Sequence, residues 1–514
     1  MAPMSTTRSL DEDALYRALS TRDARFDGRF FTGVTSTGIY CRPICRVRTP
    51  QRANCRFFGH AAQAEQAGFR PCLRCRPELA PRDRHWSTED AGDILVRQAT
   101  AWLASPVGWG SDADQPSAMA LLASRLGVSD RHLRRLFEER LGVSPLQYLL
   151  TQRLLNAKQL ISDTSLPMAE VALASGFSSV RRFNAAFSSR YGLNPTQMRR
   201  SGGMGSSKAI SAGIRLAWRP PYRADALLDF FATRALPGVE QVDPATLTLQ
   251  RTLRLTAWGR EHGGWLETRF EPDANRLILR VSDGLMAVLP AVIARVRAAF
   301  DLDAHPQAID DLLHRDFPHS DGMRVPGAFD GFELAVRAVL GQQITVRAAR
   351  TLTTRLVERF GDPLPAGTAR LDRLFPTPDA LVQADPASLG EIGIVRQRQT
   401  ALQALARAVL DGALVLDDCA DPHTEINTLL GLPGIGPWTA QYIAMRALRW
   451  PDAWPTGDVA MHHALGLGAL GAGAAKKQAE LIARRWQPWR SYALIRLWAL
   501  PPGHLHLPGQ ETIT

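Results

Sequence analysis

Four of the six cysteines form two close pairs, Cys41 with Cys45 and Cys72 with Cys75, in the pattern Cys-x3-Cys-x26-Cys-x2-Cys. Two such pairs separated by a loop are typical of a tetrahedral zinc site with one bond from each thiolate. The alternatives are two disulfides or four unrelated thiols. A chain without a secretion signal is expected to keep its thiols reduced, and four cysteines within 35 positions argue against chance. The spacing therefore predicts one Zn2+ held by four cysteines.

Arginines flank both cysteine pairs. Four thiolates around one Zn2+ carry a net negative charge, and a metal-held thiolate stays nucleophilic at neutral pH. A ring of arginines around such a site would hold a phosphate backbone against it. The flanking residues are Arg42, Arg46, Arg48, Arg52, Arg70, Arg74 and Arg76.

The segments "TGIYCRPIC" and "AGFRPCLRC" resemble the N-terminal metal domain of the Ada family of adaptive-response regulators, over residues 10–80. The resemblance implies that Cys41 takes a methyl group from a methylphosphotriester in DNA, once per molecule. Cys45, Cys72 and Cys75 would remain as zinc ligands. Methylation makes the site less negative, so its repulsion from DNA phosphates falls and its affinity for DNA rises.

Asp458 is the carboxylate whose sequence context suits catalysis. In "WPTGDVAMHHAL" it opens an expected helix, where free N–H groups and the helix dipole keep a carboxylate ionised. An isolated Asp at this place is more often only a helix N-cap. Upstream, "LPGIGPWTA" puts Gly434 and Gly436 in a turn, where both permit positive φ and close approach of a DNA phosphate to the next helix. A simple packing turn is the other interpretation of this hairpin.

Residues 214–500 resemble the helix-hairpin-helix DNA glycosylases, and among them 3-methyladenine DNA glycosylase II. The resemblance is carried by "LAWRPPYRADALLDFFATRALPGVE", "AVRAVLGQQIT" and "WQPWRSYALIRLWAL". It implies that Asp458 is the catalytic carboxylate, which stabilises an oxocarbenium-like sugar. It also implies an aromatic pocket that stacks on cationic alkylated purines. Its residues would be Phe230, Trp438, Tyr442 and Trp498.

Two positions depart from relatives in this group. Trp438 stands where bifunctional relatives carry a Schiff-base lysine, which argues against strand cleavage. Gln342 and Gln343 stand in the loop that wedges into the vacated base stack, where 3-methyladenine DNA glycosylase II has an apolar residue. A glutamine fills the gap and offers hydrogen bonds to the orphan base.

Two helix-turn-helix units are predicted between the zinc motif and the glycosylase region. Residues 117–150 and 168–200 each hold two apolar-periodic segments, broken by "LGVSD" and "SGFSS". Amphipathic packing helices with solvated arginines are the alternative. The region 88–200 resembles the DNA-binding domain of AraC-type regulators. The candidate DNA contacts on the second helix of each unit are Arg131, Arg134, Arg135, Arg181, Arg182 and Asn184.

Charge and length support a multidomain DNA-binding protein. The chain has 514 residues and a net charge of +11, and residues 1–210 hold 29 Lys and Arg against 18 Asp and Glu. All of the net charge lies there, which favours nucleic acid as partner. We expect no membrane segment and a cytoplasmic, nucleoid-associated location. Two helix-turn-helix units in one chain favour a monomer. A transcriptional activator also implies RNA polymerase as a further partner.

The predicted fold is multidomain: a small zinc-bound α/β domain, an all-α double helix-turn-helix, an α+β module and an all-α helix-hairpin-helix glycosylase domain. Strands are expected at 247–255, 265–272 and 276–283, and helices from about 285. The expected boundaries are 1–85, 86–200, a Gly/Ser-rich linker at 201–213, 214–300 and 301–510.

These features predict a fusion of alkylation repair with its regulation. The alternatives are a transcription factor whose C-terminal half only holds DNA, a glycosylase with lyase activity, and a zinc-dependent redox or scaffold protein.

Overall fold

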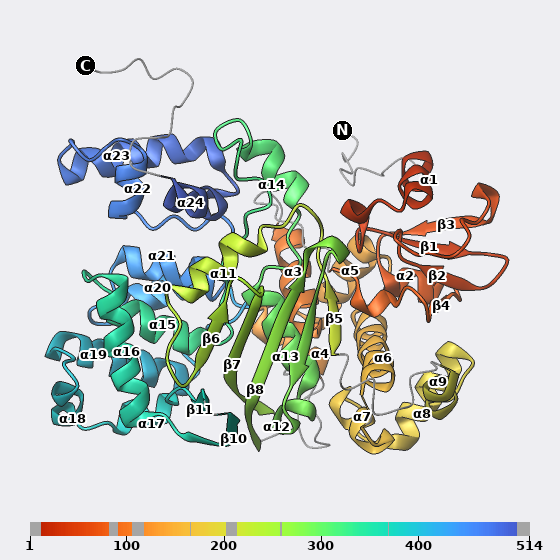
Figure 1. Cartoon of the computed structure of the whole chain (residues 1–514). Helices are drawn as coiled ribbons and strands as arrows, with labels where there is room; N and C mark the ends of the chain where they lie inside the picture. Colours follow the sequence, from red (N-terminus) through yellow and green to blue (C-terminus); the bar gives the residue numbers. More distant parts are fainter. Residues whose placement is uncertain are drawn as a thin grey trace. The chain divides into compact units, whose positions relative to one another are not determined.

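The computed structural model describes residues 12–81, 91–104, 118–164, 166–201, 213–257, 260–368 and 370–500. Two units emerge, residues 1–84 with 108–220 and residues 85–107 with 221–514, and each is described by itself (Figure 1). The predicted linker at 201–213 lies outside the described residues except for its two ends. No helix in these ranges has both the length and the apolar composition that a bilayer crossing requires.

The first unit starts with a four-stranded sheet in the order β3-β1-β2-β4. β2 runs parallel to β4, with Ile39 opposite Arg70 and Tyr40 opposite Pro71. Because Cys41 ends β2 and Cys72 follows β4, this register brings the two cysteine motifs together. The elements are α1 (Glu12–Thr21), η1 (Ala24–Phe26), β1 (Phe31–Val34), β2 (Ile39–Cys41), η2 (Arg52–Asn54), β3 (Cys55–Phe58), α2 (Ala61–Gln66), β4 (Arg70–Pro71) and η3 (Pro77–Leu79).

Helices α4 to α9 and strand β5 form the rest of the described part of this unit. The same capping residues, a serine at the start and a glycine at the end, bound both α5 and α8. Ser129 caps α5 and Ser179 caps α8, each by accepting the backbone N–H three residues on. Gly142 and Gly192 end these helices at φ 66°. The helix-turn-helix prediction is confirmed, with Ser179 as the second cap. The elements are α4 (Ala118–Arg125), α5 (Asp130–Leu141), α6 (Pro145–Asp163), α7 (Met168–Ala174), α8 (Val180–Tyr191), α9 (Pro195–Ser201) and β5 (Ile214–Ala217).

The second unit contains antiparallel strands in the order β9-β8-β7-β6, which cover the three predicted strand segments. Buried Leu249, Leu253 and Leu266 alternate with more exposed residues along β7 and β8, as a sheet covered on one face requires. The elements before the helical part are α3 (Ala91–Ala104), α11 (Ala224–Ala232), β6 (Glu240–Asp243), β7 (Thr248–Ala257), β8 (Arg260–Glu271), η5 (Pro272–Ala274), β9 (Arg276–Val281), α12 (Asp283–Met286) and α13 (Leu289–Ala299).

The remaining chain is mainly helical around one apolar core, as the periodicity predicted, and the two-stranded sheet of β10 and β11 is the part that an all-α prediction missed. Helices α20 and α21 form the expected hairpin, and α22 and α24 pack against each other, which positions the site described below. The elements are α14 (Pro306–Leu313), α15 (Gly331–Leu340), α16 (Val346–Phe360), β10 (Pro363–Thr368), β11 (Leu371–Arg373), α17 (Pro378–Gln383), α18 (Pro386–Glu391), α19 (Arg396–Leu410), α20 (Pro422–Leu430), α21 (Pro437–Arg446), α22 (Val459–Ala464), α23 (Ala472–Ala483), η6 (Arg484–Trp486) and α24 (Arg490–Ala499).

Candidate functional site

The four predicted cysteines meet at one point of the first unit. Their sulfur atoms all lie within 4.8 Å of one another. Sulfurs bound to one tetrahedral Zn2+ at about 2.3 Å are about 3.8 Å apart, so the set fits this ion. Cys41, Cys45 and Cys72 are buried and Cys75 is half-buried. The burial keeps the sulfurs together and away from competing ligands.

Hydrogen bonds distinguish Cys41 from the other three. Backbone N–H groups donate to Cys45, to Cys72 and to Cys75, the last from Arg42 at 3.3 Å. No backbone donor to Cys41 is found among the described residues. The sulfur of Cys41 is therefore the least stabilised as an anion by the surrounding backbone.

The expected ring of arginines around the cysteines is only partly present. Arg42 is buried against Asp27 and donates to the carbonyl of Cys75, so it supports the site from inside. Arg52 pairs with Glu12 and Asp13, and Arg76 pairs with Glu78. The residues of the set that are exposed are Arg46, Arg48 and Arg74. The positive surface available to a phosphate is thus smaller than the sequence suggested.

The predicted base-reading residues of both helix-turn-helix units lie on the surface of α5 and α8. Arg131, Arg134, Arg135, Arg181, Arg182 and Asn184 are all exposed. Arg134 pairs with Asp130 and Arg135 with Glu139 along their helix. Exposed pairs of this kind are weak, so DNA phosphates can replace them.

Two buried glutamates join the metal domain to these helices, and the sequence reasoning missed both. Glu65 of α2 accepts hydrogen bonds from Tyr40 at 3.0 Å and from Thr151 of α6 at 3.3 Å. It also lies 3.4 Å from Arg190 of α8 and accepts from Tyr191 at 3.5 Å. Burial raises the pKa of Glu65 to about 7, against the opposing effects of Arg190 and the hydroxyl donors.

Glu78 makes the second connection. It pairs with Lys158 of α6 at 2.5 Å, and both side chains are only 1% exposed. Arg76, which directly follows Cys75, also pairs with Glu78 at 3.0 Å. Tyr40 directly precedes Cys41, so each glutamate contacts a neighbour of a zinc ligand.

In the second unit, Asp458 caps α22 and its carboxylate receives three hydrogen bonds. Oδ1 accepts from the backbone N–H of Met461 at 2.8 Å and from Nε1 of Trp498 at 3.0 Å. Oδ2 accepts from Nε1 of Trp438 at 3.0 Å. Asp458 is 8% exposed. Three N–H donors from different parts of the chain hold this carboxylate in one orientation.

The four predicted pocket aromatics form two stacks that meet at Asp458. Trp438 stacks on Tyr442 with ring centroids 5.0 Å apart, and Trp498 stacks on Phe230 at 6.4 Å, both at 12° between planes. All four rings are half-buried, so part of each faces the surroundings. The carboxylate fixes the two indoles, and each indole orients a second ring.

Two guanidinium groups border the aromatic cluster. Arg446 donates to the hydroxyl of Tyr442 at 2.6 Å and to the carbonyls of Pro326 and Gly327. Arg234 lies over the ring of Phe230. Burial raises the pKa of Tyr442, but Arg446 and Arg234 lower it by more, so its pKa falls below the usual value.

The hairpin holds only one of its two glycines at positive φ. Gly434 has φ 77°, whereas Gly436 has φ −93° and is the N-cap residue of α21 without a side-chain cap. Both glycines permit positive φ, and the structure uses this freedom at Gly434 but not at Gly436. Its open backbone leaves the N–H groups of α21 uncovered by any side chain of its own, as phosphate binding requires.

The two wedge-loop glutamines have different surroundings. Gln342 donates to the carbonyl of Gly434 at 2.9 Å and to Thr439 at 3.0 Å, and its own carbonyl accepts from Arg398. Gln343 is exposed and has φ 56°. Gln342 therefore fastens this loop to the hairpin, and Gln343 is the glutamine that projects from it.

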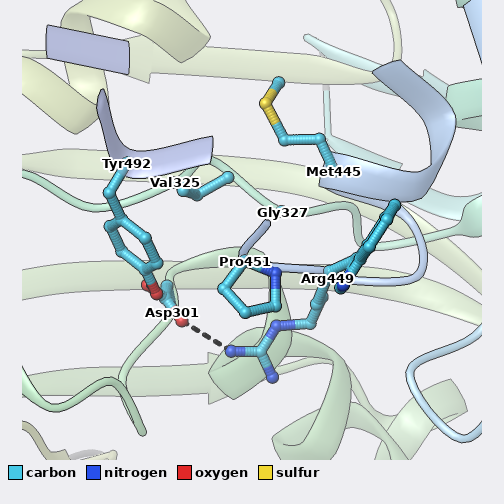
Figure 2. A pocket seen from close by; sticks show the side chains of 8 residues that line it. Asp301, Val325, Gly327, Met445, Arg449, Pro451 and Tyr492 are labelled. Carbon is cyan, nitrogen blue, oxygen red and sulfur yellow. Dashed lines mark hydrogen bonds and ion pairs between the residues drawn. The ribbon is translucent and has the colours of Figure 1, made fainter. Parts of the chain in front are cut away.

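A small cavity in this unit is lined by none of the predicted site residues. Figure 2 shows Asp301 paired with Arg449, with Tyr492, Gly327 and Met445 also around the space. The pair is 2.6 Å apart, and Tyr492 donates to the other carboxylate oxygen at 2.7 Å. Both Asp301 and Arg449 have positive φ, so the ion pair holds two strained turns together. We interpret this cavity as structural.

Comparison with known proteins agrees with this organisation. The family model for the metal binding domain of Ada matches residues 14–78, and a helix-turn-helix domain model matches 122–201. The AlkA N-terminal domain matches 213–330, and the HhH-GPD superfamily of base excision DNA repair proteins matches 336–490. A probable bifunctional transcriptional activator/DNA repair enzyme AlkA from Mycobacterium tuberculosis is 38% identical over 95% of this chain and 96% of the relative.

The chain belongs to the AlkA family of bifunctional transcriptional activator/DNA repair enzymes.

Two Escherichia coli proteins match separate parts of this AlkA family member. DNA-3-methyladenine glycosylase 2 is 35% identical over 55% of this chain and 95% of its own length. The bifunctional transcriptional activator/DNA repair enzyme Ada is 34% identical over 28% of this chain and 36% of its own length. The protein therefore combines a DNA repair glycosylase with an Ada-like regulatory region that binds DNA, and the cysteine cluster is its Zn2+ site. The predicted fold class is confirmed.

Proposed function

We propose that the second unit excises alkylated bases of the 3-methyladenine type by hydrolysing the N-glycosidic bond, with Asp458 as the catalytic carboxylate. The observation that carries this proposal is the position of Asp458 at the start of α22, between two tryptophans that donate to its two oxygens. A structural N-cap needs only the bond to Met461. The added indole donors hold the carboxylate in one orientation beside half-buried rings.

The chemistry follows from the positions of these groups. A flipped base stacks on the aromatic rings, the bond from C1′ to the base nitrogen breaks, and the base leaves with the electron pair. The negative charge of Asp458 stabilises the oxocarbenium-like sugar, and water adds at C1′ with loss of a proton. A carboxylate accepts about four hydrogen bonds, so the three that Asp458 receives leave about one position for water or for the sugar.

Two further assignments belong to this reaction. Trp438 offers no amine, so no Schiff base forms and the enzyme does not cleave the strand; borohydride should trap no covalent DNA adduct. Gln343 fills the space of the flipped base, while Gln342 fixes the loop to the hairpin. Gly434 and Gly436 hold the DNA backbone at the start of α21.

We further propose that Cys41 accepts a methyl group from a DNA methylphosphotriester. Its thiolate attacks the methyl carbon, an S–C bond forms, and the C–O bond breaks with its electron pair passing to the phosphate oxygen. When bound, Zn2+ keeps the cysteines as thiolates at neutral pH. Among the described residues, a backbone N–H donates to each of the other three sulfurs and none to Cys41, which supports this choice. The product is a neutral thioether, so the site becomes less negative and DNA binding strengthens.

The helix-turn-helix residues would turn this change into transcription. The arginines of α5 and α8 and Asn184 read a promoter, and an activator bound there contacts RNA polymerase. One chain supplies both reading helices, so a monomer suffices. The predicted division into five segments, with repair chemistry at both ends, is part of this proposal.

The test of the glycosylase is base release from methylated duplex DNA. Asp458→Asn should lower the single-turnover rate about 1000-fold, the scale seen when a buried electrostatic stabiliser is removed. Asp385→Asn is the matched control, because Asp385 also caps a helix but is exposed and has no indole donor. Release of 3-methyladenine by the wild type and the control alone supports the proposal. No release by any of the three would leave a DNA-holding module.

The test of the methyl acceptor is transfer of labelled methyl from methylated DNA to the full chain. Cys41→Ser should abolish uptake while part of the zinc binding remains. Cys55→Ser is the control, since Cys55 is also buried but bonds to Gln51 outside the cluster. Uptake that persists in Cys41→Ser would show that another sulfur is the acceptor.

A further inference from the structure

Two arginines supply positive charge to the base pocket. The guanidinium of Arg234 lies 3.7 Å from the ring centroid of Phe230, and that of Arg446 lies 4.8 Å from it. Arg446 also lies 5.4 Å from the ring centroid of Tyr442. The faces of these rings are thus already engaged by cations of the protein itself.

Neither guanidinium is paired with a carboxylate in the described part of the chain. Arg234 donates to the carbonyl of Phe230 and to Thr233, and Arg446 donates to two carbonyls and to Tyr442. Nearby Arg337 differs, because it pairs with both Glu240 and Glu333. Burial lowers the pKa of Arg234, and Arg446 and Arg337 lower it further, while the nearby hydroxyl of Tyr442 opposes them.

This arrangement suits one class of leaving base better than another. A cationic alkylated purine takes the electron pair of the broken bond and leaves neutral, so it needs no positive charge in the pocket. A neutral modified purine leaves as an anion unless it is protonated. Positive groups placed where negative charge develops stabilise the transition state, and they weaken binding of a ground-state cation.

We propose that Arg234 determines base selectivity by stabilising the developing negative charge of neutral modified purines, while it adds nothing to the release of cationic ones. Arg446 is held in place by the carbonyls of Pro326 and Gly327, and its positive charge adds to that of Arg234. This inference rests on the proposed glycosylase function, and it revises the expectation that the aromatic pocket favours cations.

The experiment compares release of hypoxanthine, a neutral base, with release of 7-methylguanine, a cationic one, from matched duplexes under single-turnover conditions. Arg234→Met keeps most of the side-chain volume and removes the charge. It should slow hypoxanthine release about 10-fold or more, while 7-methylguanine release changes less than about 3-fold. Arg234→Lys should restore part of the hypoxanthine rate. Arg223→Met, an exposed residue paired with Asp225, is the control and should change neither rate.

Equal losses for both bases in Arg234→Met would show that Arg234 only supports the fold of the pocket, and would overturn the proposal. Unchanged rates for both bases would overturn it as well. No release of either base by the wild type would instead reject the proposed glycosylase, and the selectivity proposal with it.

Discussion

Glu65 and Asp458 are both buried carboxylates that accept several hydrogen bonds, yet they belong to different kinds of site. Glu65 is 1% exposed, and its partners are Arg190 and three hydroxyl groups that come from a strand and two helices. Asp458 keeps 8% exposure, starts a helix and bonds to two indoles whose rings are half-buried. Burial and donor number alone therefore do not mark a catalytic carboxylate. A remaining opening toward a stacking surface separates the two.

The largest expected effect is on the stability of the first unit around the fully enclosed Glu65. Glu65→Ala removes the acceptor of Tyr40, Thr151 and Tyr191 and leaves Arg190 without its carboxylate. We expect the unfolding free energy of the first unit to fall by about 4 kcal/mol, as for other broken buried pairs. Amide hydrogen exchange in α6 and α8 of the full chain measures it. Glu138→Ala, at an exposed position of α5, should change it by less than about 0.5 kcal/mol. Similar changes in unfolding free energy for Glu65→Ala and Glu138→Ala would show that Glu65 does not stabilise this unit.

The second effect is a pH dependence that belongs to Glu65. Its pKa of about 7 lies above that of an unfolded glutamate, so between these values the folded state binds more protons. Stability is then full at low pH and falls as the pH rises through the folded pKa, by up to about 3 kcal/mol. Glu65→Gln does not titrate. The wild type should therefore lose stability relative to Glu65→Gln between about pH 4.5 and pH 7. Parallel stability curves for the two proteins would contradict the burial argument.

The third effect tests the indole N–H groups that donate to Asp458. Trp438→Phe keeps the aromatic ring and removes the N–H that bonds to Oδ2 of Asp458. We expect single-turnover base release to slow by about 10- to 100-fold, the value of one hydrogen bond to a charged group. Trp450→Phe should leave the rate unchanged. An unchanged rate in Trp438→Phe would show that the bond from its N–H to Asp458 does not contribute to base release.

The smallest expected effect is the effect of a mutation at one site on the activity or metal content of the other. Glu65→Gln should change base release by less than about twofold, because the two carboxylates serve separate chemistry. Zinc content of Trp438→Phe should likewise equal that of the wild type, by metal analysis of the purified chain. A large change in either measurement would show that the two sites are coupled.

Features that depend on local spacing were predictable from the sequence. The paired cysteines predicted the metal site, and the breaks "LGVSD" and "SGFSS" predicted where the two helix-turn-helix units turn. Gly434 takes the left-handed conformation for the same local reason. Gly436 does not, because a glycine permits positive φ but does not require it.

Features that depend on distant residues were not predictable. Trp438 and Trp498 were expected as stacking rings, and their N–H groups reach Asp458 from 20 and 40 positions away. Glu65 meets Thr151 and Tyr191 across 86 and 126 positions. Arg42 was expected at the surface and is instead buried against Asp27. Neither the periodicity of the sequence nor a short motif predicts which distant residue will be the partner of a buried polar group.

The buried glutamates have a consequence for how this gene architecture arose. A crossover that transferred only the metal domain would leave Lys158 without Glu78 and Arg190 without Glu65 in the recipient. The loss of Glu78 would leave the buried charge of Lys158 unpaired, at a cost of several kcal/mol. A crossover that carried the metal domain together with α4 to α9 would break neither pair. Natural fusions and engineered chimaeras should therefore keep the metal domain and α4 to α9 together.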